Sequence, residues 1–199
     1  MSRNIDYYFT PVSPFTYLGH DRFVEIARRR GATVAVKPID LGKVFPVSGG
    51  LPLAQRAPQR QAYRLVELAR WSRFLRLPLN PRPAHFPVSA NLASRWILAA
   101  LEHGVDAALA FAGALGRAVW ADERNVAEPA TLAAIAGAQG LDPDALDERA
   151  NAPDTATHYA MLTQEAIDRG VFGAPTYVYD GELFWGQDRL DFLDRALAK

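Results

Sequence analysis

Residues 5–15 of the chain read IDYYFTPVSPF, and within this stretch a strand pattern gives way to a helix start. The aromatic and β-branched residues from Ile5 to Thr10 are typical of a short buried strand. Ser13 is a favourable N-cap residue, and Pro14 suits the first helical position because its missing N–H is not needed there. We therefore expect a strand that ends near Thr10 and a helix that begins at Pro14.

The residues that follow extend this pattern to a second strand. Apolar residues recur at helical spacing from Phe15 to Ala27, and Gly31 is a suitable helix stop. Residues 33–37 then alternate apolar and polar side chains, as a strand does. Strand, helix and strand in this order predict two parallel strands joined by a crossover helix.

The C-terminal end predicts a hairpin and a closing helix. Residues 176–179 and 182–185 are rich in strand formers and are separated by Asp180-Gly181, a strong signal for a tight turn. After Gly186 a last helix should bury one side against the sheet, with Leu190, Leu193 and Leu197 on that side.

The middle of the chain is expected to be helical. Strand signals almost vanish over residues 52–168, and Pro129 and Pro143 stand where helices would start. The sequence thus predicts an α/β protein in which residues 1–51 and 169–199 form one domain and residues 52–168 form an all-helical insertion.

Composition excludes several classes of function. Lysine plus arginine equals aspartate plus glutamate at 22 each, so no basic excess favours nucleic acid or anionic lipid. The chain has no cysteine, which excludes disulfides, thiolate metal sites and a redox thiol of its own. The N-terminus shows no apolar leader and no segment reaches membrane-spanning length, so we expect a cytoplasmic protein without membrane or nucleic-acid partners.

Ser13 is the first candidate site residue. A hydroxyl at a helix start lies beside free N–H groups and the positive end of the helix dipole, which stabilise an anion. A thiolate placed there would have a lowered pKa. Because the chain supplies no thiol, the thiolate would arrive on a cofactor, for which glutathione is the abundant cytosolic candidate. The alternative is that Ser13 only caps the helix.

Pro175 is the second candidate. It follows Gly173-Ala174 at the start of a predicted strand. Such a proline is either a simple strand-entry residue or the second residue of a cis peptide that turns the preceding backbone towards a ligand. The residues themselves leave both alternatives open.

Three motifs taken together closely resemble those of the 2-hydroxychromene-2-carboxylate isomerases, which are relatives of kappa-class glutathione transferases and of periplasmic disulfide oxidoreductases. They are SPFTYLG at residues 13–19, GVFGAPT at 170–176 and FWGQDRL at 184–190. The resemblance extends over essentially the whole chain. It implies a thioredoxin-like fold with a helical insertion, a homodimer and a cis peptide before Pro175.

The resemblance also implies how glutathione would be held. Ser13 would hydrogen-bond its sulfur, the backbone of Ala174 would pair with its cysteinyl unit, and Gln187 and Asp188 would hold its γ-glutamyl end. For Asp188 the alternative is a cap of the last helix. The full set of implied cofactor-binding residues is Ser13, Ala174, Pro175, Trp185, Gly186, Gln187 and Asp188.

The implied activity is glutathione-dependent isomerisation of 2-hydroxychromene-2-carboxylate to trans-o-hydroxybenzylidenepyruvate, in the degradation of aromatic hydrocarbons, or of a related unsaturated keto acid. Reversible addition of a thiolate would free a double bond to rotate, and Ser13 would stabilise the thiolate without attacking substrate. Two alternatives remain open: a kappa-like transferase that conjugates glutathione to electrophiles, and a non-catalytic thioredoxin-like binding module.

The acid group of such a substrate needs a cation. Lys43 is the candidate because it follows the second strand, where the family shapes its substrate pocket, and Lys37 is its competitor. Each lysine could instead be an ordinary surface residue. Phe86 and Trp185 could form apolar walls for an aromatic ligand, although large aromatic residues also serve as core.

Two positions depart from the family pattern. Ser48-Gly49-Gly50 stands in the loop after the second strand, where many relatives carry asparagine, which puts one pocket hydrogen bond in doubt. Arg60 stands where lysine is frequent, which preserves the charge.

Metal and hydrolase chemistry have little support. The four histidines are widely separated without ligand spacing, so no metal is expected. The residues around Ser13 lack the glycines of a hydrolase nucleophile elbow.

Overall fold

The computed structural model describes residues 3–199. Residues 1 and 2, which belong to the predicted first domain and to the N-terminus searched for a leader, lie outside this range. The strands are β1 (Asn4–Phe9), β2 (Thr33–Pro38), β3 (Thr176–Tyr179) and β4 (Glu182–Trp185). The helices are α1 (Pro14–Arg30), α2 (Leu41–Ser48), α3 (Pro58–Leu75), α4 (Asn91–Ala100), α5 (Val105–Trp120), α6 (Pro129–Ala138), α7 (Pro143–Asn151), α8 (Pro153–Asp168) and α9 (Leu190–Leu197), with short 3-10 turns at Leu53–Gln55, Leu101–His103 and Gln187–Arg189.

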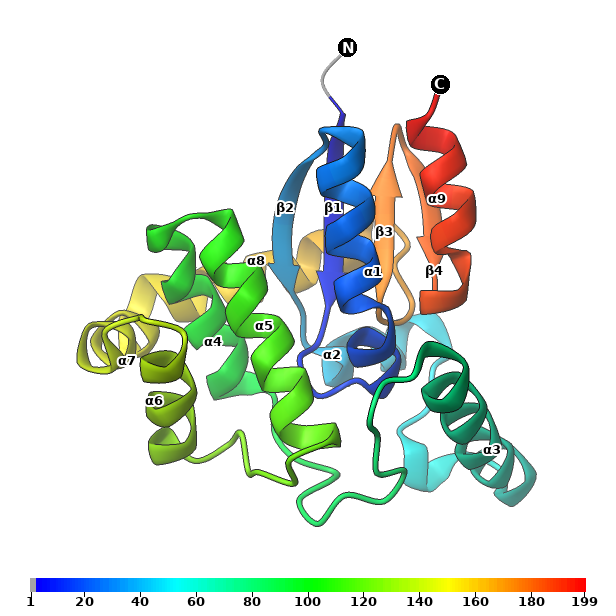
Figure 1. Cartoon of the computed structure of the whole chain (residues 1–199), viewed down its shortest axis with the longest axis horizontal. Coiled ribbons are helices and arrows are strands. Elements are labelled where there is room, and N and C mark those ends of the chain that lie inside the picture. Colours follow the sequence, from blue (N-terminus) through cyan, green and yellow to red (C-terminus); the bar gives the residue numbers. More distant parts are fainter. Residues whose placement is uncertain (1–2) are drawn as a thin grey trace.

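The strands form one mixed sheet in the order β2-β1-β3-β4 (Figure 1). β1 pairs parallel with β2, and β3 pairs antiparallel with both β1 and β4. The turn between β3 and β4 has positive φ at Asp180 and Gly181, the conformation expected for this dipeptide. The predicted parallel pair and the predicted hairpin therefore meet in a single sheet.

The sheet is covered on both faces (Figure 1). Tyr7 and Phe9 of β1 join the core beneath α1 and α9, whereas Tyr8 packs with Val44 of α2 and Ala166 of α8 on the opposite face. Alternate residues of a strand point to opposite faces, so one short strand supplies both cores.

The helices between β2 and β3 continue this core and do not form a detached unit. Phe23 of α1 belongs to the same apolar cluster as Trp96 of α4 and Phe111 of α5. Helices α6 and α7 extend the cluster outwards, and α3 projects at the other side of the molecule (Figure 1). Helices α3 to α8 all fall within the predicted insertion, and its boundaries stay a prediction.

One helix departs from the predicted layout. The segment after β2, which we expected to be a loop, forms α2. Asp40 caps this helix by accepting a hydrogen bond from the amide of Gly42, and Pro46 lies inside it. Since proline is unfavourable inside a helix, the residues themselves give little sign of α2.

Candidate active site

Ser13 stands at the N-terminus of α1, where the fold brings two distant segments together. Its backbone is extended, and its Oγ accepts a hydrogen bond of 3.2 Å from the amide of Thr16, so it caps the helix. The same hydroxyl donates a hydrogen bond of 3.4 Å to the carbonyl of Ala174. Capping and a place in the site are therefore compatible roles for one side chain.

The segment opposite Ser13 contains a cis peptide bond between Ala174 and Pro175. The carbonyl of Pro175 accepts a hydrogen bond of 2.9 Å from the amide of Gly186, and the hydroxyl of Thr176 donates one of 2.8 Å to the carbonyl of Gly173. These bonds fix the backbone on either side of Ala174. The Ala174 amide itself donates no hydrogen bond within residues 3–199.

A cavity of about 590 Å³ opens in front of these residues. This volume lies within the range of about 300–1,000 Å³ that is usual for small-molecule sites. Its wall includes the residues after β1 and the start of α1. Helices α2 and α3 and the residues before β3 also contribute to it. The lining residues are Thr10, Val12, Ser13, Pro14, Phe15, Leu41, Phe45, Ser48, Gly49, Gly50, Leu51, Leu53, Arg56, Ala57, Arg60, Arg64, Phe86, Phe172, Gly173, Ala174 and Trp185.

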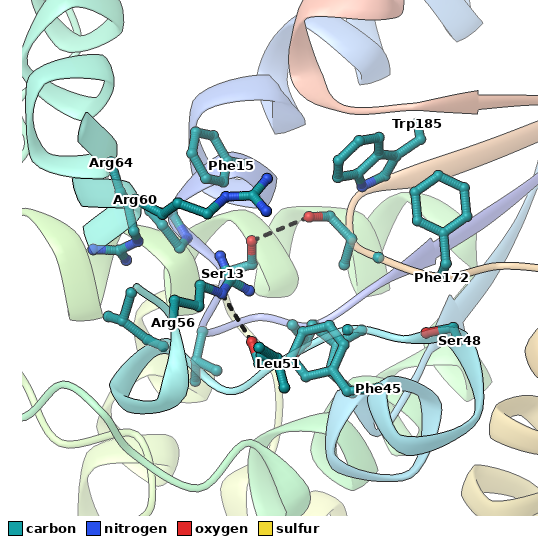
Figure 2. Close-up of a pocket in the computed structure, with 18 of the residues that line it drawn as sticks. Ser13, Phe15, Phe45, Ser48, Leu51, Arg56, Arg60, Arg64, Phe172 and Trp185 are labelled. Atoms are coloured by element: carbon teal, nitrogen blue, oxygen red, sulfur yellow. Dashed lines mark hydrogen bonds between the residues drawn. The ribbon is translucent and has the colours of Figure 1, made fainter. Parts of the chain in front are cut away.

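The two sides of the cavity differ in character (Figure 2). Arg56, Arg60 and Arg64 extend from the α3 side, whereas Phe172 and Trp185 stand on the opposite side of Ser13. No aspartate or glutamate is among the lining residues. The cavity is thus cationic on one side and aromatic on the other.

The two rings of the aromatic side contact each other and are both partly exposed, Phe172 at 41% and Trp185 at 51%. The rings of Phe172 and Trp185 lie 4.7 Å apart, and a Cβ added to Gly173 would come within 2.5 Å of the indole nitrogen of Trp185. Gly173 is therefore required for the present position of Trp185.

The arginines on the other side are held in different ways. The Nε of Arg56 donates a hydrogen bond of 2.8 Å to the carbonyl of Leu51, and its guanidinium lies 5.9 Å from the ring of Phe45. The guanidinium of Arg64 lies 5.3 Å from the ring of Phe86 and 5.6 Å from that of Trp120. Burial, with the nearby charge of Arg56, lowers the pKa of Arg64 to about 10.

Several predicted site residues come together here. Ser13, Ala174, Trp185 and Phe86 all line the cavity. Pro175 is joined to Ala174 by the cis bond. Ser48, Gly49 and Gly50, where the sequence departs from the family pattern, line the same cavity.

The predicted residues around the 3-10 turn lie outside the cavity lining. Gln187 is buried, and its side-chain oxygen accepts a hydrogen bond of 3.1 Å from Arg22. Asp188 pairs with Arg189 at 3.0 Å and does not cap α9 through its side chain. Gly186, in a positive-φ conformation, starts this turn.

The predicted substrate lysine is not brought to Ser13. Lys43 lies beside Met161 and Gln164 of α8, in a separate hollow. Its competitor Lys37 forms ion pairs with Asp6 at 2.9 Å and Glu165 at 2.7 Å. The cationic residues that line the cavity are instead the arginines of the α3 side.

Of the three cavity arginines, only Arg60 was singled out from the sequence, and Arg56 and Arg64 were missed. Their spacing of four residues was the available signal, because residues four apart in a helix share one face. Arg56 precedes α3 itself, so only Arg60 and Arg64 carry the helical signal fully.

Other kinds of site find no support in the described part of the chain. Residues 3–199 contain no group of three or more histidine, aspartate or glutamate side chains placed to hold a metal ion. None of the described helices is long and apolar enough to cross a membrane.

Comparison with known proteins places this arrangement in a family. Residues 4–198 match the family described as the DSBA-like thioredoxin domain. A 2-hydroxychromene-2-carboxylate isomerase from Sphingobium xenophagum is 35% identical over 199 residues, covering 99% of each chain. The chain belongs to the 2-hydroxychromene-2-carboxylate isomerase family of DSBA-like thioredoxin proteins.

Structural comparison agrees with this family. A solved 2-hydroxychromene-2-carboxylate isomerase superimposes with a TM-score of 0.83 at 28% identity, covering 98% of this chain and 94% of that one. A kappa-class glutathione S-transferase from Caenorhabditis elegans is a more distant relative, 24% identical over 98% of this chain and 91% of its own. The predicted thioredoxin-like fold and the predicted family are both confirmed.

Proposed function

We propose that the chain catalyses glutathione-dependent isomerisation of 2-hydroxychromene-2-carboxylate, or of a closely related unsaturated keto acid. The observation that carries the proposal is the Ser13 hydroxyl at the start of α1, which contacts the Ala174 carbonyl in the wall of a cavity, in a chain without cysteine. Family membership supports the same activity.

The residues around Ser13 fit the thiol end of glutathione. The amide of Phe15, in the first turn of α1, has no hydrogen-bond partner among residues 3–199, and the Ser13 hydroxyl is bonded to the next amide, that of Thr16. An N–H group, a hydroxyl and the helix dipole together favour an anionic sulfur. The backbone of Ala174, with its unpaired amide and its carbonyl, suits pairing with the extended backbone of a peptide ligand.

Bound glutathione would supply a thiolate nucleophile. In this proposal Ser13 turns its hydroxyl from the Ala174 carbonyl to the sulfur and keeps the thiol ionised. The arginines attract an anionic substrate into the cavity.

The far end of glutathione is assigned to the turn after β4. Gly186 and Asp188 would receive the γ-glutamyl group, with the Asp188 carboxylate pairing its ammonium. Gln187, held by Arg22, would keep this turn in place, and Pro175 would present the Ala174 backbone. We further propose that the protein is a cytoplasmic homodimer that acts on small aromatic keto acids.

The kappa-class relative favours a second candidate, conjugation of glutathione to electrophiles. Mass spectrometry separates the two activities, because a transferase leaves a stable adduct whereas an isomerase returns free glutathione. A non-catalytic binding module would show no turnover at all, and its Ser13→Ala variant would behave as the parent protein.

The proposed activity is tested by adding the chromene carboxylate to the protein with and without glutathione and following the absorbance spectrum. The expected result is conversion to the open-chain isomer that accelerates when glutathione is present. Equal rates with and without glutathione would contradict the proposal.

A further inference from the structure

The guanidinium of Arg64 lies in the cavity wall without a polar partner. It is placed near the rings of Phe86 and Trp120, at 5.3 and 5.6 Å, and makes neither an ion pair nor a hydrogen bond to residues 3–199. A guanidinium carries five N–H donors in a plane. Burial of such a group without an acceptor is unfavourable unless a ligand provides one.

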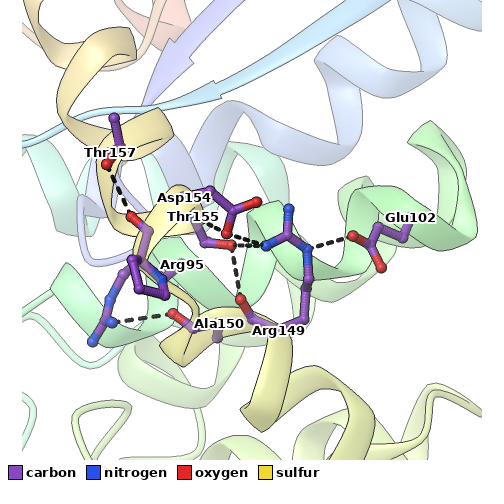
Figure 3. A network of polar contacts seen from close by, with 8 residues as sticks. Arg95, Glu102, Arg149, Ala150, Asp154, Thr155 and Thr157 are labelled. Atoms are coloured by element: carbon purple, nitrogen blue, oxygen red, sulfur yellow. Dashed lines mark hydrogen bonds and ion pairs between the residues drawn. The ribbon is translucent and has the colours of Figure 1, made fainter.

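Arg149 is an arginine whose polar partners all belong to the protein itself (Figure 3). Its guanidinium pairs with Glu102 and Asp154 and donates to the hydroxyl of Thr155 at 2.7 Å. Arg30 is paired in the same manner with Asp194 at 2.7 Å. The absence of any acceptor for Arg64 within the described residues therefore sets it apart from these two.

The aromatic neighbours of Arg64 account for part of its environment. Ring faces attract a cation. The rings accept no hydrogen bonds from the N–H groups that lie in the plane of the Arg64 guanidinium. Burial accordingly disfavours the charged form, as the lowered pKa of Arg64 indicates. An anion that enters the cavity would relieve this cost.

The three cavity arginines differ in their availability. Arg56 donates a hydrogen bond to the carbonyl of Leu51, and its guanidinium lies over the ring of Phe45. It therefore helps to fix the segment between α2 and α3. Arg60 is exposed and unpaired in the first turn of α3. Arg64, one turn further along α3, is half-buried and has free donors, and it is the best placed of the three to bind an anion firmly.

We infer that Arg64, assisted by Arg60, binds the carboxylate of the substrate, with Phe86 forming the floor beneath its rings. This inference rests on the proposed function and adds to it the residue that recognises the acid group. A carboxylate matches the planar fork of arginine with two parallel hydrogen bonds. Lys43 would have no part in this contact, since it lies in a separate hollow.

The position of Arg64 favours the substrate over the cofactor as its ligand. Glutathione is assigned to Ala174 and the β4 side, where Trp185 stands, whereas Arg64 lies on the α3 side (Figure 2). Ser13 lies between the two sides. A substrate anchored at Arg64 would therefore reach the sulfur position from the side that glutathione leaves free.

The experiment compares Arg64→Gln, Arg64→Lys and the parent protein, with Arg73→Gln as the matched control. Arg73 is an exposed arginine of the same helix outside the cavity lining. Steady-state kinetics gives KM and kcat for the chromene carboxylate, and calorimetry gives the Kd of glutathione. We expect Arg64→Gln to raise the substrate KM by about 10- to 100-fold, because a charge-assisted bond is lost. Lysine should restore binding in part, and glutathione affinity should change less than about twofold.

A second measurement does not depend on turnover. Coumarin-3-carboxylate and coumarin share one ring system and differ in the acid group, so the ratio of their Kd values reports the carboxylate contact. The parent protein and Arg73→Gln should prefer the acid, and Arg64→Gln should lose that preference.

The outcomes separate this inference from the proposed function. Weakened glutathione binding in Arg64→Gln with an unchanged substrate KM would assign Arg64 to the cofactor and overturn the inference. Unchanged KM and an unchanged coumarin ratio would overturn it as well. If the parent protein does not isomerise the chromene carboxylate, the proposed function fails, and the coumarin pair alone decides whether Arg64 binds aromatic carboxylates.

Discussion

The hydroxyl of Ser13 lies 3.4 Å from the carbonyl oxygen of Ala174, across 161 positions of sequence. The contact joins the start of α1 to the entry of β3. β1 and β3 are neighbours in the sheet, which places the two segments side by side. In this geometry the Ser13 hydroxyl donates to the Ala174 carbonyl when no ligand is bound. A ligand that displaces this bond would leave the hydroxyl free to donate to the ligand.

Ser13→Ala should slow turnover by about 10- to 100-fold, because a hydrogen bond to an anionic sulfur is lost. The loss of the helix cap should lower the free energy of unfolding by only about 1 kcal/mol. Ultraviolet absorbance of the thiolate should show a raised pKa for bound glutathione. Ser89→Ala removes an exposed hydroxyl outside the cavity and serves as the control. An unshifted thiol titration in Ser13→Ala would contradict the role given to Ser13.

Gly173→Ala should weaken glutathione binding, because the new methyl group would come within 2.5 Å of Trp185 and push the indole out of place. Calorimetry measures the change in Kd. Gly137→Ala, in α6, provides the control because its Cβ would meet nothing closer than 3.9 Å. Helix propensity predicts that this control stabilises the chain by up to about 1 kcal/mol. Unaltered glutathione affinity in Gly173→Ala would show that Trp185 does not shape the cofactor site.

Arg64→Met should stabilise the ligand-free protein while impairing substrate binding. Burial of the unpaired guanidinium lowers its pKa to about 10, so the charged form opposes folding near neutral pH. We expect the free energy of unfolding to rise by about 1 kcal/mol, or roughly 2–4 °C in Tm for a chain of this size. Thermal unfolding without ligand measures the effect, and Arg73→Met provides the comparison. A lower Tm in Arg64→Met alone would show that the ring contacts outweigh the desolvation.

The stability of the fold should fall in mild acid because of His20. Its ring hydrogen-bonds the carbonyl of Leu109 at 2.9 Å and the hydroxyl of Tyr7 at 3.2 Å, and burial lowers its pKa. The unfolded state therefore binds the proton first, so stability is complete above the unfolded pKa of about 6.5 and declines as the pH falls below it.

Urea unfolding between about pH 5 and pH 7 tests this expectation. His20→Gln should flatten the pH dependence, whereas the exposed His103→Gln should leave it unchanged. Parallel curves for His20→Gln and the parent protein would exclude His20 as the source of the slope.

The sequence predicted the parts of the fold that depend on local pattern. Strand residues at 5–9 and 33–37, the cap at Ser13 and the Asp180-Gly181 turn are all encoded by neighbouring residues, and the structure confirms them. It did not predict α2, since Pro46 and Gly42 argue against a helix whose packing on α8 comes from tertiary contact.

The candidate site was predicted only where a short motif carries it. Ser13 and Ala174 were found through their own segments and come together as expected. Arg64 faces the cavity because α3, which contacts α1, lines the same cavity as the segment before β3, a relation that no local pattern contains. Gln187 accepts a hydrogen bond from Arg22 of α1, which is distant in the sequence, so no local pattern predicts this contact either.

Glutathione-dependent isomerisation is decided by counting turnovers of the chromene carboxylate per molecule of glutathione, with the substrate in large excess over glutathione. We expect each glutathione to support many conversions and to be recovered free and unmodified by mass spectrometry. Conversion that stops after one substrate per glutathione, or that proceeds without glutathione, would contradict it.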